Sequence, residues 1–274
     1  MSSKNDRIKK HYDKGHLLTV KNKFYRDFLE RLFKLLLQID VAQGDVTSKR
    51  LIKDNKLVFA VIKAKEDGII GGVEEITHIL KKHKIKTKVK KKDKSKVKKG
   101  DILLELHGPI KDILRIERII LNIFQRMSGI ATHTYKIVKE SKPKIAATRK
   151  TLHGYLDKKA VHLGGGLTHR LNLSDSMLIK ENHLKYGKNP LKNSHIEVTS
   201  VKQAVEFAKF EPAILMFDNM SPSEVKKAIK KLPKVIIFEA SGVKDHKKYQ
   251  FVDVISLGSL TKDSHVLDTH LKIR

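Results

Sequence analysis

Five basic side chains that can bind anions lie close together near the middle of the chain. Arg149, Lys150, His169, Arg170 and Lys180 fall within 32 positions, and three of them come at the end of a short apolar run. Guanidinium groups bind carboxylates and phosphates through paired hydrogen bonds of fixed geometry, and a lysine adds a point charge. This concentration of cations predicts a site for an anionic small molecule.

Two carboxylates and two glycine-containing turns also come at the ends of short apolar runs. Glu197 and Asp218 stand at the ends of the next two apolar runs, and Ser241–Gly242 and Leu257–Gly258 end the last two. Carboxylates hold hydroxyl groups or a divalent cation, and the backbone amides of such turns can cradle a phosphate. The alternative is that each charge only solvates a strand end. Their recurrence at five successive ends favours a site for a polyanion that carries hydroxyls or a metal ion.

The elements that must position these residues are short strands alternating with helices. Helical patterns occupy 201–210 and 221–232, and from Glu197 onward each strand-plus-helix unit takes about 20 residues. This alternation is typical of a parallel sheet, with the polar residues meeting at its carboxyl edge. The six apolar runs leave both an incomplete barrel and an open doubly wound sheet possible. They are KIAATRK, SMLIKEN, HIEV, AILMFDN, VIIFEASG and VDVISLGS.

The first half of the chain has a different pattern. Its first 20 residues predict a frayed or extended start, and apolar spacing predicts a helix over 22–37 and a long helix from Ile110. The intervening β-rich segments are 57–72, 100–108 and the Lys-rich stretch Lys81–Lys99, read as a strand pair with Ile85, Val89 and Val97 pointing inward. We expect the domain boundary near Met127.

Composition excludes several classes of protein. The chain has no cysteine, which excludes disulfides, thiol nucleophiles, Fe–S clusters and cysteine-ligated zinc. No apolar run reaches the roughly 20 residues of a membrane span, and the polar first residues lack the apolar stretch of a signal peptide, so we expect a cytoplasmic protein without a membrane partner. The net charge of +28 suggests nucleic-acid binding, but the Lys-rich stretch lacks interleaved aromatic residues, which makes a nucleic-acid partner a weak expectation.

A set of longer motifs extends from Gly44 to the C-terminus. They are GDVTS (44–48), AKEDGIIGG (64–72), ERIILNIFQRMSGIAT (117–132), TRKT (148–151), GGGLTHRLNLSDSMLIKENH (164–183), DNM (218–220), EASG (239–242), VDVISLGSLT (252–261) and the terminal LDTHLKI. Together they resemble quinolinate phosphoribosyltransferase, also called nicotinate-nucleotide pyrophosphorylase.

The resemblance implies an α/β fold with two domains. An N-terminal α/β sandwich would span 1–127 and take back the last strand, 266–274, and an incomplete α/β barrel of the type II phosphoribosyltransferase kind would span 128–265. The implied reaction joins quinolinate to phosphoribosyl pyrophosphate and gives nicotinate mononucleotide, pyrophosphate and CO2, in NAD biosynthesis. It also implies Mg²⁺ and a homodimer or larger homo-oligomer, with Arg118 donated by the neighbouring subunit.

The resemblance assigns roles residue by residue, with Lys150, Lys180, Glu197 and Asp218 as the catalytic group. The quinolinate pocket would be lined by Arg118, Thr148, Arg149, His169, Arg170 and Lys180. Lys150 would contact phosphoribosyl pyrophosphate, and Glu197 and Asp218 would hold ribose hydroxyls and Mg²⁺, partly through substrate and water. The 5′-phosphate loops would be Ser241, Gly242 and Val243 together with Leu257, Gly258 and Ser259.

The sequence departs from the family pattern in four places. Ala147 replaces an aspartate, Val243 replaces a glycine, and His195 stands where the first of two alternating glutamates is usual. The stretch after Thr151 is shorter and lacks an arginine. These changes bear on substrate choice, so two alternatives stay open: a relative of the same fold with another substrate (molybdenum-transport-associated or nicotinate-using), and a basic nucleic-acid-binding protein.

Overall fold

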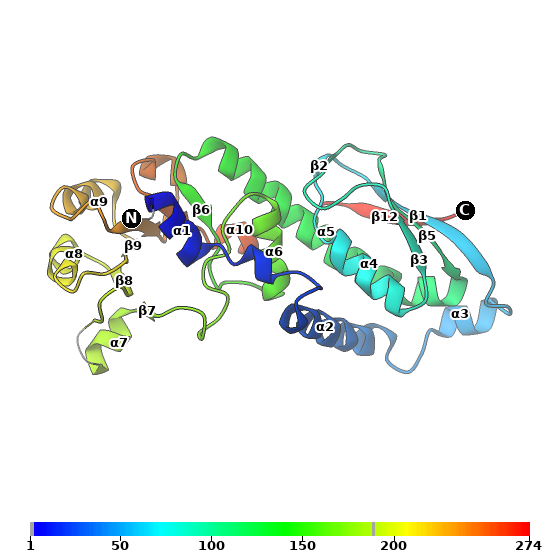
Figure 1. Cartoon of the computed structure of the whole chain (residues 1–274). Coiled ribbons are helices and arrows are strands. Elements are labelled where there is room, and N and C mark those ends of the chain that lie inside the picture. Colours follow the sequence, from blue (N-terminus) through cyan, green and yellow to red (C-terminus); the bar gives the residue numbers. More distant parts are fainter. Residues whose placement is uncertain (1–2, 188–189) are drawn as a thin grey trace. The chain divides into compact units, whose positions relative to one another are not determined.

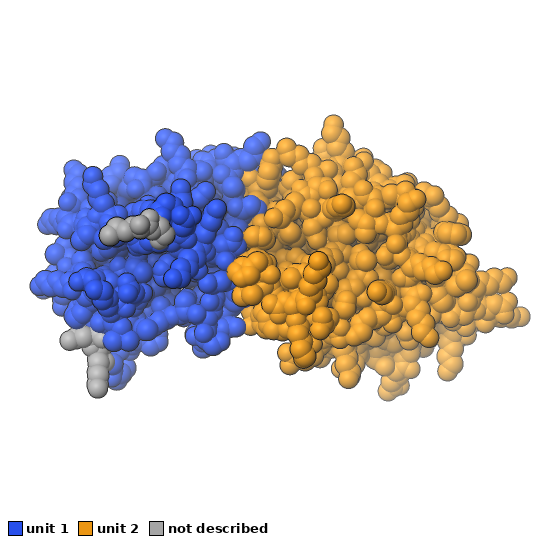
Figure 2. Space-filling view, viewed as in Figure 1, with its two compact units in different colours: residues 1–14, 136–152, 165–262 blue, residues 15–135, 153–164, 263–274 orange. Residues whose placement is uncertain are grey.

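The computed structural model describes residues 3–187 and 190–274. The chain forms two compact units, coloured separately in Figure 2. Unit 1 comprises residues up to 14, 136–152 and 165–262, and unit 2 comprises 15–135, 153–164 and 263–274. None of the helices described is both long and apolar enough to cross a bilayer.

Unit 1 is built on a parallel sheet whose strand order is β6-β11-β10-β9-β8-β7. Strands β6, β7, β8 and β9 are labelled in Figure 1. Each of the six apolar runs singled out in the sequence supplies one of these strands. They are β6 (Lys144–Ala146), β7 (Leu178–Ile179), β8 (His195–Val198), β9 (Ile214–Asp218), β10 (Ile237–Ser241) and β11 (Val254–Ser256). Every pairing between neighbours is parallel, and a parallel bridge from Ala146 to Leu167 extends the β6 edge. The predicted α/β class with a parallel sheet is therefore confirmed.

Short helices follow the strands from β7 to β11. They are α7 (Glu181–Tyr186), α8 (Val201–Ala208), α9 (Pro222–Ile229), the 3-10 turn η2 (His246–Tyr249) and α10 (Ser259–Lys262). Helix α9 begins with a capping box, because the Ser221 side chain accepts the Glu224 N–H while the Glu224 carboxylate accepts the Ser221 N–H. This cap fixes the residue at which α9 begins and therefore the length of the turn between β9 and α9.

The first residues are helical, so the expectation of a frayed or extended start was wrong. Helix α1 (Lys4–Tyr12) has its own capping box between Ser3 and Asp6. Ile8 and Tyr12, one helical turn apart, are buried together with sheet residues of β9, β10 and β11. Burial of this apolar pair against the sheet stabilises a helix that is too short to form alone.

Unit 2 contains an antiparallel sheet of order β12-β1-β5-β3. Its strands are β1 (Leu57–Ala64), β3 (Lys86–Val89), β5 (Ile102–Pro109) and the last strand of the chain, β12 (Thr269–Ile273), which pairs with β1; β2 (Gly68–Ile69) pairs with β4 (Lys96–Val97). Its helices are η1 (Gly15–Leu17), α2 (Lys23–Val41), α3 (Val46–Leu51), α4 (Val73–Lys82), α6 (Tyr155–Leu163) and most of α5 (Ile110–Glu140). Helix α5 passes the expected boundary at Met127, because Ile130, Ala131 and Thr134 continue its buried face.

The Lys-rich stretch forms two strands, β3 and β4, but these are not the expected pair, because β3 pairs with β5 and β4 pairs with β2. Ile85 and Val97 are buried, as expected, but Val89 is 38% exposed, so its inward placement was wrong. Val89 is the last residue of β3, an edge strand that pairs on one side only, with β5. Its side chain therefore lacks the cover that a central strand receives.

Candidate active site

The alternation of β-strands places the polar residues of unit 1 on one side of the sheet. Residues two apart on a strand share a face, so Met216 and Asp218 on β9 point the same way, as do Glu239 and Ser241 on β10. In register, Asp218 stands beside Ser241, and Ser241 beside Ser256. The carboxyl ends of the parallel strands thus bring these side chains to one rim.

A pocket of about 370 Å³ lies at this rim. The structure brings together ten residues predicted from the sequence, namely Thr148, Arg149, Lys150, His169, Arg170, Lys180, Glu197, Asp218, Ser241 and Gly242. Sequence reasoning missed four further lining residues, namely Leu178, Met216, Asn219 and Ser256. Met216 could have been predicted, because it lies two positions before Asp218 on β9 and alternate residues of a strand share a face. Asn219 could have been predicted because it is the residue directly after Asp218.

Three of the four lysine and arginine side chains in the pocket have no ion-pair partner among the described residues. These are Arg149, Lys150 and Arg170, whereas the Lys180 ammonium pairs with the Glu197 carboxylate. Burial, together with the neighbouring Arg149, lowers the pKa of Arg170, which still remains a cation because an arginine does not deprotonate in proteins. Its guanidinium donates one hydrogen bond, from Nη1 to the Ser176 carbonyl at 3.1 Å. The pocket therefore holds positive charge that no acidic side chain of the described residues neutralises by an ion pair.

The two carboxylates lie at the ends of adjacent strands, β8 and β9. Glu197 is half-buried beside Lys180, and the Asp218 carboxylate accepts a hydrogen bond from the Asn219 side chain at 2.8 Å. Both offer oxygen donors, the kind that a hard cation such as Mg²⁺ prefers. The donor set of the pocket therefore fits that ion.

Two glycines leave room for the turns beside the pocket. Gly242 has a φ of +69°, and a Cβ there would lie 2.3 Å from Asn219 Oδ1, so both conformation and space require glycine. A Cβ on Gly258 would lie 3.1 Å from Cδ of Lys150, which shows how closely that turn approaches the lysine. Val243, Leu257, Gly258 and Ser259 do not line the pocket themselves, although they belong to the same two turns.

Arg118 lies on α5 in unit 2, and its side chain is exposed to solvent. It is not among the residues that line the pocket of this chain.

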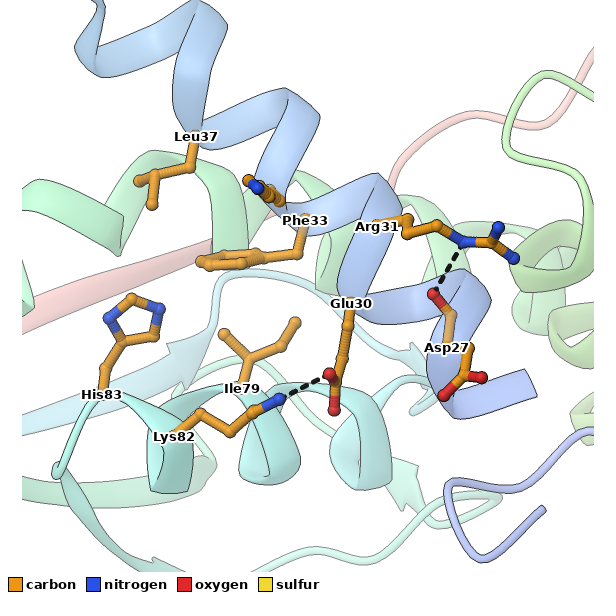
Figure 3. A pocket seen from close by; sticks show the side chains of 9 residues that line it. Asp27, Glu30, Arg31, Phe33, Leu37, Ile79, Lys82 and His83 are labelled. Atoms are coloured by element: carbon orange, nitrogen blue, oxygen red, sulfur yellow. Dashed lines mark hydrogen bonds and ion pairs between the residues drawn. The ribbon is translucent and has the colours of Figure 1, made fainter. Parts of the chain in front are cut away.

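Unit 2 has a larger hollow, of about 580 Å³, between α2 and α4 (Figure 3). Phe33 and His83 meet there edge to face, with ring centroids 5.3 Å apart, and Leu37 and Ile79 add apolar surface. Both of its carboxylates already have a lysine partner, since Asp27 pairs with Lys23 and Glu30 pairs with Lys82. Size therefore does not identify the reactive site, and the smaller pocket of unit 1 holds the convergent charges that chemistry needs.

Comparisons with known proteins agree with this choice of pocket. Family models for the N-terminal and C-terminal domains of quinolinate phosphoribosyl transferase match residues 45–128 and 130–272. A probable nicotinate-nucleotide pyrophosphorylase (carboxylating) from Archaeoglobus fulgidus is 37% identical over 84% of this chain and 98% of its own length, and one from Methanocaldococcus jannaschii is 35% identical over 90% and 98%. The solved nicotinate-nucleotide pyrophosphorylase from Francisella tularensis superposes with a TM-score of 0.82 at 30% identity, covering 90% of this chain and 96% of that one. The chain belongs to the quinolinate phosphoribosyl transferase family.

Proposed function

We propose that the pocket of unit 1 binds quinolinate and phosphoribosyl pyrophosphate and converts them into nicotinate mononucleotide, pyrophosphate and CO2. The enzyme is a quinolinate phosphoribosyltransferase of NAD biosynthesis, as its relatives are named. The observation that carries the site assignment is the group of unpaired cations, Arg149, Lys150 and Arg170, gathered in one pocket with two carboxylates. Both substrates are polyanions, and such a pocket supplies the charge they need.

Quinolinate carries two carboxylates on adjacent ring carbons. Arg149 and Arg170 can each bind a carboxylate through two parallel N–H groups, and Lys180 can add a third positive charge. Leu178 and Met216 give the same pocket apolar surface that suits a flat pyridine ring. We assign the quinolinate site to this part of the pocket, with Thr148 and His169 completing its wall.

Phosphoribosyl pyrophosphate would lie against the turns that end β10 and β11. The Ser241–Gly242–Val243 and Leu257–Gly258–Ser259 turns would offer backbone amides to the 5′-phosphate, and Lys150, which lies close to Gly258, would contact the pyrophosphate group. Glu197 and Asp218 would hold the ribose hydroxyls and a Mg²⁺ ion. When bound, Mg²⁺ would neutralise charge on the pyrophosphate group.

The residues of the pocket can promote both chemical steps. Holding the ring nitrogen of quinolinate against C1 of the ribose favours formation of the N–C1 bond as the C1–O bond to pyrophosphate breaks. Lys150 lies where it can stabilise the departing pyrophosphate charge. The resulting pyridinium accepts the electron pair released when the 2-carboxylate leaves as CO2, and C2 then takes up a proton.

We further infer a homodimer or larger homo-oligomer in which Arg118 reaches the pocket of a neighbouring subunit. Arg118 is exposed on α5, so it is accessible to a second copy. A cation from another subunit would also compensate for the arginine that is missing after Thr151. The cytoplasmic location expected from the sequence stays a prediction.

One assay tests the proposed function. Purified protein is incubated with quinolinate, phosphoribosyl pyrophosphate and Mg²⁺, and nicotinate mononucleotide and CO2 are followed by mass spectrometry and by release of the labelled 2-carboxylate. Parallel reactions replace quinolinate by nicotinate or omit Mg²⁺. We expect product that requires quinolinate and Mg²⁺; product from nicotinate alone would assign the pocket to another substrate.

A further inference from the structure

Four buried side chains lie behind the pocket and are not explained by direct substrate binding. They are Tyr12 of α1, His169, His195 of β8 and Glu239 of β10, all at most 7% exposed. His195 lies two residues before Glu197 on β8, and Glu239 lies two residues before Ser241 on β10. Because alternate residues of a strand share a face, both side chains lie on the face of the sheet that forms the pocket. Of the four, His169 alone lines the pocket.

Three of these side chains converge on the carboxylate of the fourth. Tyr12 donates its O–H to Glu239 Oε2 at 2.5 Å, and His195 Nε2 lies 2.9 Å from the same oxygen, without the alignment of a full hydrogen bond. His169 Nε2 lies 3.4 Å from Oε1. The rings also pack together, with Tyr12 edge-on to His169 at 5.0 Å and His169 stacked on His195 at 5.5 Å.

The charge states follow from these contacts. Burial by itself would raise the pKa of Glu239, but the imidazoles of His169 and His195 hold it well below its ordinary range. Burial, together with the Glu239 charge, raises the pKa of Tyr12 well above its ordinary value. Glu239 is therefore an ionised acceptor, and Tyr12 is a neutral donor to its Oε2 in a fully buried position.

The same cluster has the composition of a metal site, because donor atoms of His169, His195 and Glu239 lie within 4.8 Å of one another. The backbone argues against that role. The N–H of Arg170 donates to His169 Nδ1 at 2.7 Å, so the proton of a neutral ring sits on Nε2, the atom that faces Glu239. A ligand nitrogen must present a lone pair to the metal, whereas this one presents a proton to a carboxylate.

We propose that Tyr12, Glu239 and His195 are positioning residues for quinolinate binding, acting through His169 on Arg170. This inference rests on the proposed function of the pocket. Glu239 Oε1 lies 3.4 Å from His169 Nε2, and its negative charge favours the tautomer with the proton on Nε2. This leaves Nδ1 to accept the backbone N–H of Arg170 and so sets the start of the Arg170 side chain.

A second connection ties the same segment to α1. The hydroxyl of Thr168, the residue before His169, donates to the Tyr12 carbonyl at 2.9 Å and accepts the N–H of Lys14 at 2.9 Å. Tyr12 thus holds the 168–170 segment by its backbone as well as by its phenol. The helix that sequence reasoning missed carries this anchor.

The first experiment compares two buried tyrosines that each donate a hydrogen bond to a buried glutamate, one in each unit. Tyr12→Phe removes the hydrogen bond to Glu239, and Tyr25→Phe removes a similar one, since the buried Tyr25 donates to Glu75 Oε1 at 2.7 Å in unit 2. Both should lower Tm by similar amounts. Tyr12→Phe should raise the KM for quinolinate at least about fivefold while the KM for phosphoribosyl pyrophosphate stays unchanged, and Tyr25→Phe should change neither. Equal kinetics in the two variants would reduce Tyr12 to a purely structural role and overturn the proposal.

A second pair keeps the proposal testable if Tyr12→Phe does not fold. His195→Gln retains an N–H donor near the Nε2 position, and His195→Leu removes it in a similar volume. We expect His195→Gln to keep a KM for quinolinate within about twofold of the parent and His195→Leu to raise it like Tyr12→Phe. Indistinguishable KM values in the two variants would contradict the proposed role of the donor.

A direct readout does not need turnover. The ¹⁵N chemical shifts of the His169 ring, assigned by comparison with a His169→Gln sample, should show a protonated Nε2 and an unprotonated Nδ1. In Tyr12→Phe the two shifts should move toward each other, as expected for a mixture of the two tautomers. A mixed tautomer in the parent protein would overturn the proposal even if the enzyme is active. If the parent binds one equivalent of added Zn²⁺ that His195→Leu loses, the cluster is a metal site instead. Absence of any quinolinate turnover in the parent, with the expected ¹⁵N pattern intact, would count against the proposed function alone.

Discussion

A substitution of Arg170 tests most directly whether the cations of the pocket that lack an ion-pair partner among the described residues serve to bind substrate anions. Arg170 is buried, it has no ion-pair partner among the described residues, and its neighbour Arg149 carries the same charge. Replacing it with glutamine removes about two charge-assisted hydrogen bonds to a substrate carboxylate, each worth about 1.5–3 kcal/mol. A loss of about 3–4 kcal/mol in transition-state stabilisation lowers kcat/KM by about 10²- to 10³-fold.

The stability of the unliganded protein should respond quite differently. Arg170→Gln loses one hydrogen bond to the Ser176 carbonyl, worth about 1 kcal/mol, but also relieves the cost of a buried charge beside Arg149. We therefore expect the free energy of unfolding to change by less than about 1 kcal/mol.

Arg126 provides the matched control. Its guanidinium binds the fully buried Asp157 carboxylate through two hydrogen bonds of 2.8 Å, so Arg126→Gln removes the arginine charge that pairs with a buried carboxylate. This variant should lose about 3 kcal/mol of stability. Both variants are measured by urea unfolding without substrate and by initial rates with quinolinate varied. If Arg170→Gln destabilises the protein as much as Arg126→Gln, or retains near-normal kcat/KM, the reasoning about unpaired cations is refuted.

Three further outcomes are expected. Lys150→Ala should lower kcat/KM at least about 100-fold, because a phosphate charge then lacks its partner, and steady-state kinetics with near-normal values would remove Lys150 from the site. Mixing Arg118→Ala with Lys180→Ala subunits should restore part of the activity that each variant lacks alone, if sites are shared between subunits; no recovery after subunit exchange would indicate self-contained sites. Burial lowers the pKa of His195 although the Glu239 carboxylate opposes the shift, so the unfolded chain takes up a proton at about pH 6.5 that the folded state resists. The contribution of His195 to the free energy of unfolding should therefore be complete above that pH and should decrease below it. In His195→Gln, the free energy of unfolding measured with urea should decrease less between pH 7.5 and 5 than in the parent protein.

Local sequence was sufficient for most of unit 1. Each strand of the parallel sheet is an apolar run of a few residues bounded by polar ones, and the ends of such strands must meet at one edge, so Arg149, Lys180 and Asp218 could be placed together without coordinates. Likewise the start of α9 was readable, because its capping box is made by residues only three apart. These features depend on neighbours in sequence, which is why sequence alone determined them.

What only the tertiary structure decided depends on residues far apart in the chain. Tyr12 and Glu239 are separated by 227 positions, and nothing in the local pattern of either predicts their hydrogen bond. Val89 has the alternation of an inward strand residue but lies at the end of an edge strand, and the pairing of β3 decided its exposure. Helix α1 is stabilised because Ile8 and Tyr12 pack against the sheet. Burial energy and the pairing of charges depend on which surfaces meet, and that is set by the fold as a whole rather than by any segment of it.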